Sequence, residues 1–207
     1  VILLIGAGLL ARSSIRTSAI AEGLQSGAWD KVLSLDAEDK TALVGRATQR
    51  LNLSPPDIDG AFKDLTLAEQ IDGLAEGLRV AQGLAHAKRA AASAKTNKIS
   101  DAKQDLETAR TLGAPDPPLS AAKQALAAAY VRSAEQSLQR GDANGVLSAC
   151  TAAEKLGSAG IDLSKLRAGA FVVRATRLEQ SGDLEGALLA YDEGQKLGWQ
   201  PLQSSKQ

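Results

Sequence analysis

The side chains that most often act as nucleophiles, general bases or metal ligands are scarce in this chain. It has one histidine, His86, and one cysteine, Cys150, in 207 residues. His86 lies among Leu84, Ala85 and Ala87 with no second metal ligand at helical spacing, which favours a structural or surface role. Cys150 falls at an apolar helix position, where a buried structural thiol is more common than a reactive one.

The other residues that could do chemistry form no catalytic set. Ser54, Ser120 and Ser164 stand in expected loops or at helix starts, where serine serves as a turn former or helix cap. No glycine-rich loop carrying a lysine follows a strand-like run, so a phosphate cradle is unsupported. The carboxylates lie beside basic residues rather than as an isolated apolar pair. The sequence therefore predicts a non-enzymatic protein with no cofactor and no metal.

Composition favours a thin helical array. Apolar residues make up 44% of the chain but aromatic residues 3%, and alanine and glycine dominate. Small residues at helix contacts let two helices approach closely, which suits a two-layer array better than one thick core. The formal net charge is zero, so no global field attracts nucleic acid, and we expect no nucleic-acid partner.

A short phrase recurs at a spacing of about forty residues. QRGDA at 139–143 is followed by a helical stretch that ends on KLG at 155–157, and forty-one residues later QSGDL at 180–184 leads to KLG at 196–198. A fainter copy surrounds Asn97, which stands where the later copies have a turn glycine. Self-similarity at this period indicates stacked helix–turn–helix units, each of which needs a neighbour to bury its apolar face.

The last unit resembles a tetratricopeptide repeat (TPR). Phe171, Ala175 and Leu178 on its first helix, with Ala187 and Tyr191 on its second, match the family's large-small-large pattern. The resemblance covers about 84–201 well and 15–51 partly. It implies that the two helices cross most closely at the two alanines, and that the stack serves protein–protein interaction.

We therefore predict an all-α protein in which antiparallel helix–turn–helix repeats stack as a short TPR-like solenoid, preceded by the end of a transmembrane helix. Asp57 to Phe62 could form a short helix. Thr66 and Glu69 form a capping-box pattern, so a long helix is expected from Thr66 to about Lys95. The expected segments are half of a transmembrane anchor at 1–11, a degenerate repeat at 12–51, a Pro-containing hinge or loop at 52–65, TPR-like repeats at 66–201 and a disordered tail at 202–207.

The membrane prediction rests on the uncharged apolar run at 1–11, which Arg12 and Arg16 follow. A spanning helix needs about twenty residues, so this run is too short by itself. It could be the second half of a span, the core of a signal peptide or a buried core helix. The two arginines suit the membrane interface and favour the span. We expect a single-pass anchor with the following domain on the periplasmic, extracytoplasmic side.

The TPR resemblance also implies where a partner would bind. The inner face, formed by the first helix of each repeat, would present Val131, Glu135, Leu138, Gln139, Val172, Thr176, Glu179 and Gln180. This set lacks the paired lysines or arginines that would clamp a terminal carboxylate. The alternative is that these are ordinary solvated residues with a few packing contacts.

A second candidate surface is a basic patch formed by Lys88, Arg89, Lys95, Lys98 and Lys103. Acidic residues precede it along the same expected helix, and this order complements the helix dipole by about 0.3–1 kcal/mol per charge. Its functional interpretation is a contact with anionic lipid headgroups or an acidic subunit.

The leading functional hypothesis is a membrane-anchored scaffold, an accessory subunit of a larger complex whose protein partners include integral membrane subunits. The alternative is a non-catalytic sensor or tail module of a longer membrane receptor or kinase, with the activity upstream of this segment.

Overall fold

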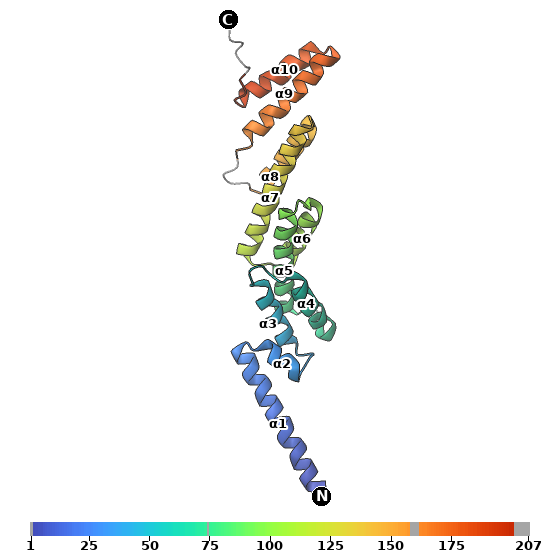
Figure 1. The fold of residues 1–207 in the computed structure, drawn as a ribbon, viewed down its shortest axis with the longest axis vertical. Helices are drawn as coiled ribbons and strands as arrows, with labels where there is room; N and C mark the ends of the chain where they lie inside the picture. Colours follow the sequence, from blue (N-terminus) through green and yellow to red (C-terminus); the bar gives the residue numbers. More distant parts are fainter. Residues whose placement is uncertain (1, 74, 158–161, 201–207) are drawn as a thin grey trace. The chain divides into compact units, whose positions relative to one another are not determined.

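The computed structural model describes residues 2–73, 75–157 and 162–200, with backbone alone for 2–13 and 72. Every regular element in these ranges is an α-helix, which confirms the all-α prediction (Figure 1). The helices are α1 (Ile2–Ser26), α2 (Trp29–Leu35), α3 (Lys40–Leu51), α4 (Ile58–Asp72), α5 (Glu76–Lys95), α6 (Ile99–Thr111), α7 (Asp116–Gln139), α8 (Ala143–Lys155), α9 (Ser164–Ser181) and α10 (Leu184–Lys196). The expected tail at 202–207 lies outside the described residues.

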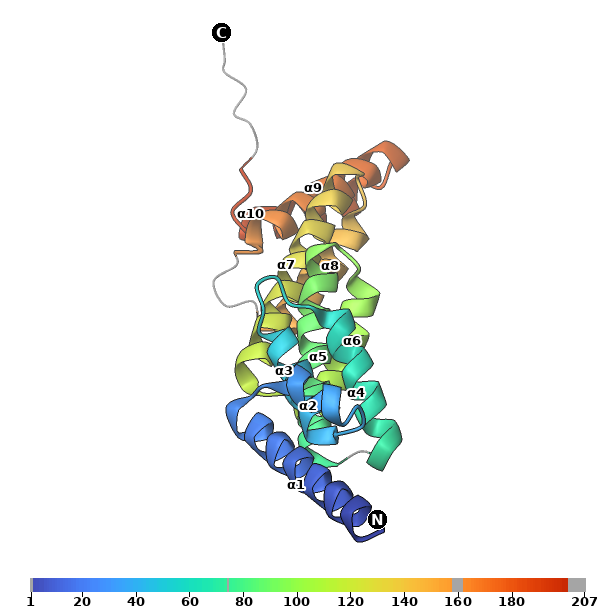
Figure 2. The ribbon, with the colours of Figure 1, turned by 60° about the horizontal axis from the view of Figure 1, so that its bottom comes forward.

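The chain divides into two compact units. Unit 1 comprises 1–89 and 105–119, and unit 2 comprises 90–104 and 120–207, so the division passes through α5 and α6. Within unit 1, α3 and α4 pack side by side (Figures 1 and 2). Within unit 2, α9 packs against both α8 and α10.

The recurring phrase has a recurring backbone. Gly141 after α7 and Gly182 after α9 adopt the left-handed conformation, with φ of 71° and 84°. Glycine adopts this conformation without the Cβ clash that other residues meet, and it commonly ends helices. Asn97, in the fainter copy, also has a positive φ, of 62°, which asparagine tolerates better than most residues. The sequence repeat therefore reflects a shared way of ending the first helix of each pair.

An aspartate after each turn glycine begins the second helix. The carboxylate of Asp142 accepts a hydrogen bond from the backbone N–H of Gly145 at 2.9 Å, and Asp183 accepts one from Gly186 at 2.9 Å. These caps satisfy backbone donors that the first turn of a helix leaves unpaired. A Cβ on either glycine would lie within 2.5 Å of the capping carboxylate, so glycine is what makes room for the cap.

The structure differs from the prediction around α4. The capping-box pattern predicted a helix start at Thr66, but Thr66 lies inside α4, and the side chain of Asp57 caps that helix instead. The expected continuous helix to Lys95 is interrupted at Gly73, whose φ of 64° ends α4 before α5 begins. Of the expected loop at 52–65, residues 52–57 precede the helix and the rest belong to it.

Unit 1 has a leucine core and unit 2 an alanine-rich one. In unit 1 the largest fully buried side chains are Val32, Leu43, Leu51, Leu65 and Leu78. In unit 2 the buried positions are mostly small, with Leu126, Val146 and Cys150 as larger members. Ala175 and Ala187 are 0% and 2% exposed, as the expected close crossing of α9 and α10 requires.

The transmembrane part of the prediction has no counterpart among the helices of the described residues. Among the residues that the structure describes, none of the helices combines the length and the apolar character needed to cross a membrane. Arg16, expected at a membrane interface, donates a hydrogen bond to the backbone carbonyl of Leu35 at the end of α2. This contact ties α1 to α2 within unit 1.

Candidate protein-binding surface

Two buried carboxylates in unit 1 are engaged in structural ion pairs. Asp64, on α4, has a side chain that is 6% exposed. Arg46 donates to it from Nε at 2.9 Å and from Nη2 at 2.7 Å, and Arg50 donates from Nη1 at 2.9 Å. Bidentate geometry of this kind compensates the loss of hydration of the buried charge. The cluster joins α3 to α4 and pairs the buried carboxylate with two guanidinium groups.

Asp105, on α6, is the second buried carboxylate. Arg89 donates to it from Nε at 2.8 Å and from Nη2 at 2.7 Å, and Nδ1 of His86 hydrogen-bonds to it at 2.8 Å. The Phe62 ring stacks edge-on against His86 and lies 4.3 Å from the guanidinium carbon of Arg89. Burial alone would raise the pKa of Asp105, but the hydrogen bonds from Arg89 and His86 outweigh it and hold the pKa below its ordinary value.

These contacts bear on two sequence predictions. His86 occupies a structural position in unit 1, as its apolar sequence neighbours indicated. Arg89, expected in the basic patch, instead neutralises Asp105 in the same cluster. Of the other patch members, Lys88 is half-buried in unit 1, whereas Lys95, Lys98 and Lys103 are exposed in unit 2.

Cys150 is fully buried in unit 2. Burial is the main cause that raises the pKa of its thiol. A thiol with a raised pKa forms little of the reactive thiolate. Across the described residues, no group of three or more histidine, cysteine, aspartate or glutamate side chains could hold a metal ion.

The apolar residues of the expected inner face are partly used in packing. Val131 and Leu138 lie half-buried against the core of unit 2. Leu138 of α7 lies close to Gly169 of α9. A Cβ on that glycine would be only 3.1 Å from Cδ2 of Leu138. Val172 is also half-buried, next to Gly194 of α10. These three side chains therefore help to hold the helices together and offer little apolar surface to a partner.

The polar residues of the same face are exposed: Glu135, Gln139, Thr176, Glu179 and Gln180. Two of them have contacts inside the protein. Glu179 accepts a hydrogen bond from the hydroxyl of Tyr191 at 3.1 Å, and the hydroxyl of Thr176 donates to the backbone of its own helix. The structure thus places the predicted polar set on the surface without showing that it forms a binding site.

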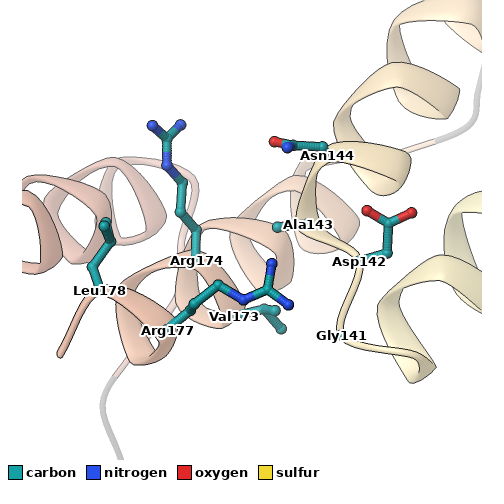
Figure 3. Close-up of a pocket in the computed structure, with 8 residues that line it drawn as sticks. All are labelled: Gly141, Asp142, Ala143, Asn144, Val173, Arg174, Arg177 and Leu178. Atoms are coloured by element: carbon teal, nitrogen blue, oxygen red, sulfur yellow. The ribbon is translucent and has the colours of Figure 1, made fainter. Parts of the chain in front are cut away.

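Three neighbouring cavities mark a different surface of unit 2. The first, about 250 Å³, lies between the turn at 141–144 and α9 (Figure 3). The second, about 240 Å³, lies between α9 and α10 and shares Arg174 and Leu178 with the first. The third, about 380 Å³, lies along α10 and shares Leu189 with the second. These shared residues link the cavities into one surface across α8, α9 and α10.

Sequence reasoning missed two arginines in the first cavity. Arg174 and Arg177 are exposed on α9 and line the cavity with Asp142, Asn144 and several apolar side chains. Neither makes a hydrogen bond or an ion pair through its side chain with any residue in the described ranges. The signal was present in the sequence, since two arginines three residues apart share one helix face.

The most exposed apolar side chains of unit 2 lie on α10. Leu184, Leu188 and Leu189 are 69%, 71% and 63% exposed. We name these three residues the leucine face. By the forty-one-residue repeat, Leu184 and Leu188 correspond to Ala143 and Leu147 of α8.

Those α8 residues have the opposite environment. Ala143 and Leu147 pack against the buried cluster of unit 2, which includes Ala170 of α9. At these two positions the preceding repeat is half-buried, whereas the last repeat is exposed. No protein-family model, curated protein or solved structure matches this chain, so its functional assignment rests on its own residues and geometry.

Proposed function

We propose that the protein is a non-enzymatic scaffold of TPR-like repeats that holds a partner protein by stacking one of the partner's helices on α10. The observation that carries the proposal is the exposure of Leu184 and Leu188, whose counterparts Ala143 and Leu147 are half-buried against the core of unit 2. Stacked helical repeats bury their apolar faces against a neighbour, and an exposed apolar patch on a soluble domain commonly marks an interaction site.

The energy of such a contact is substantial. Full burial of one leucine side chain contributes about 1.5–3 kcal/mol. Three leucines that are about two-thirds exposed could therefore contribute on the order of 3–6 kcal/mol before the cost of association. That range suits a specific contact that further polar interactions strengthen.

Charge indicates the kind of helix that fits. The α10 helix carries three acidic residues and one basic residue, whereas α9, the helix that packs on α8, carries four basic residues and one acidic residue. An ion pair of 2.7 Å already joins Arg167 of α9 to Glu154 of α8. We therefore expect the partner helix to be amphipathic and basic, since opposite charges across the contact favour association.

A synthetic peptide with the α9 sequence, residues 164–181, is a suitable probe. We expect the labelled peptide to bind the whole chain saturably in fluorescence anisotropy, and Leu188→Asp to weaken binding at least tenfold. Leu53→Asp is the matched control, because Leu53 is a 53% exposed leucine of unit 1. Equal binding to both variants would contradict the proposal.

The same variants address the two other occupants of the leucine face. If the chain sedimented as a dimer and Leu188→Asp abolished that dimer, the leucine face would be occupied by a second copy of the chain. If the chain bound neutral lipid vesicles and this binding depended on Leu188, the occupant of the leucine face would be a lipid surface. Either result would replace the partner helix in the proposal.

We also propose that the apolar run at 1–11 attaches the protein to a membrane. The support is the uncharged sequence of that run, which begins α1. Carbonate extraction of native membranes tests this directly. The protein should remain in the pellet, and its release into the supernatant would remove the anchor from the proposal.

A further inference from the structure

We propose that the cavity between the turn at 141–144 and α9 binds a carboxylate side chain of an acidic peptide segment, with Arg177 and Arg174 as its cationic ligands. This site differs from the leucine face in position and chemistry, and it goes beyond helix stacking on α10. Its residues belong to unit 2 and come from α8, α9 and the turn before α8.

The two arginines approach the cavity differently. Figure 3 shows the guanidinium of Arg177 directed across the cavity toward the turn at Gly141, while that of Arg174 points away from it. Arg174 also lines the second cavity, where Asp183 and Glu193 are its neighbours, and it forms no ion pair with either. We therefore assign Arg177 as the principal ligand and Arg174 as the one that turns in when an anion binds.

The charge of the cavity fits one carboxylate. Its lining holds two arginines and one acid, Asp142, and so carries a formal charge of +1. Asp142 accepts a hydrogen bond from Gly145 as the cap of α8, which holds its negative charge beside the two arginines without pairing it to either of them. A monoanion balances this charge, whereas a phosphate dianion would exceed it and would lie close to Asp142.

The walls of the cavity favour a side chain over a free ion. Val173 and Leu178 of α9 and Ala143 of α8 supply apolar surface beside the arginines. The methylene groups of a glutamate could pack on this surface while its carboxylate meets a guanidinium, whose planar donors match two carboxylate oxygens.

The arginine pair is a property of this repeat and not of repeat packing. Forty-one residues earlier, the positions of Arg174 and Arg177 are occupied by Ser133 and Gln136. The turns before α8 and α10 nonetheless share a left-handed glycine and an aspartate cap, although only the helix before α10 carries the two arginines. The turn and the cap therefore do not require the two charges, and their position beside the cavity supports a role in recognition.

The test uses a labelled twelve-residue peptide of alternating glutamate and leucine and the same peptide with glutamine in place of glutamate. The glutamate peptide should bind the whole chain in fluorescence anisotropy, and binding should weaken as salt is added. Arg177→Gln should weaken it at least fivefold and Arg174→Gln by a smaller factor. Lys165→Gln removes an exposed charge elsewhere on α9 and should change nothing.

Three results would overturn the proposal. If the glutamine peptide bound as tightly as the glutamate peptide, the cavity would not recognise a carboxylate. If all three variants lost binding equally, the attraction would be an unspecific one to the charge of α9. Tighter binding of inorganic phosphate or of phosphatidylglycerol vesicles, with the same dependence on Arg177, would change the ligand class. Leu188→Asp should leave the glutamate peptide bound, so this site and the leucine face can fail separately.

Discussion

Leu147 and Leu188 occupy equivalent positions in successive repeats, forty-one residues apart, yet their environments are opposite. Leu147 packs against the buried cluster of unit 2, and Leu188 is 71% exposed on α10. The difference follows from what covers each helix. The α8 helix packs against α9, and Leu147 lies against a cluster that includes Ala170 of α9, whereas no described element covers Leu188.

This pair predicts unequal effects of one substitution on stability. Leu147→Ala should lower the free energy of unfolding by roughly 1–3 kcal/mol, because it removes packed methyl groups and leaves a partial cavity. Leu188→Ala should change it by less than about 0.5 kcal/mol, as is usual for exposed positions. Thermal or urea unfolding measures both, and a loss at Leu188 as large as at Leu147 would show that α10 is covered within the chain.

The crossing of α9 and α10 predicts sensitivity to added volume. Ala175→Leu and Ala187→Leu should each destabilise unit 2 by about 1–3 kcal/mol, because both positions are buried and have no room for a larger side chain. Gln195→Leu, at an exposed position of α10, should have little effect on unfolding. If all three variants unfolded like the wild type, the helix pair would not cross at these alanines.

The Asp105 cluster predicts a loss of stability in acid. Its pKa in the folded protein lies below the ordinary value of 3.8, so the folded state stabilises the charged form. That contribution to stability is complete at pH values above the pKa of Asp105 in the unfolded protein. It is lost as the pH falls through the lower pKa of Asp105 in the folded protein. The stability difference between wild type and Asp105→Asn should therefore shrink between pH 5 and pH 2.5 in urea titrations. A difference independent of pH would contradict the ionised state of Asp105.

The same cluster predicts that Arg89 matters for stability more than an ordinary surface arginine. Arg89→Ala removes the bidentate partner of the buried Asp105 carboxylate, and hydrogen bonds to a charged group contribute about 1.5–3 kcal/mol. Arg110→Ala breaks an exposed pair with Glu107 and should cost less than about 1 kcal/mol. Similar unfolding midpoints for the two variants would show that the contact between Arg89 and Asp105 stabilises the protein no more than an exposed ion pair does.

The sequence predicted those parts of the fold that short-range rules decide. The all-α class, the turns at Gly141 and Gly182 and the buried small residues at Ala175 and Ala187 follow from local periodicity and backbone preference. The helix start expected at Thr66 was wrong, because the capping-box pattern there lies inside α4, which Asp57 caps, and the sequence alone does not rank two competing caps.

The candidate surfaces were harder to predict, since a helix pattern gives a residue's face but not its neighbours. Arg89 was assigned to a basic patch, because its partner Asp105 lies sixteen residues away on another helix. Arg174 and Arg177 were overlooked, because their cavity is completed by the turn of the preceding repeat. The exposure of Leu188 depends on the absence of a covering helix among the described residues, which its own sequence does not reveal.

The central claim is that α10 accepts a helix as α8 accepts α9. The most direct test is an NMR titration of the methyl-labelled chain with the peptide of residues 164–181. The account predicts that the methyl signals of Leu184, Leu188 and Leu189 shift together and saturate with one binding constant, while that of Leu53 does not move. Saturable shifts confined to other methyl groups, with these three unchanged, would contradict it.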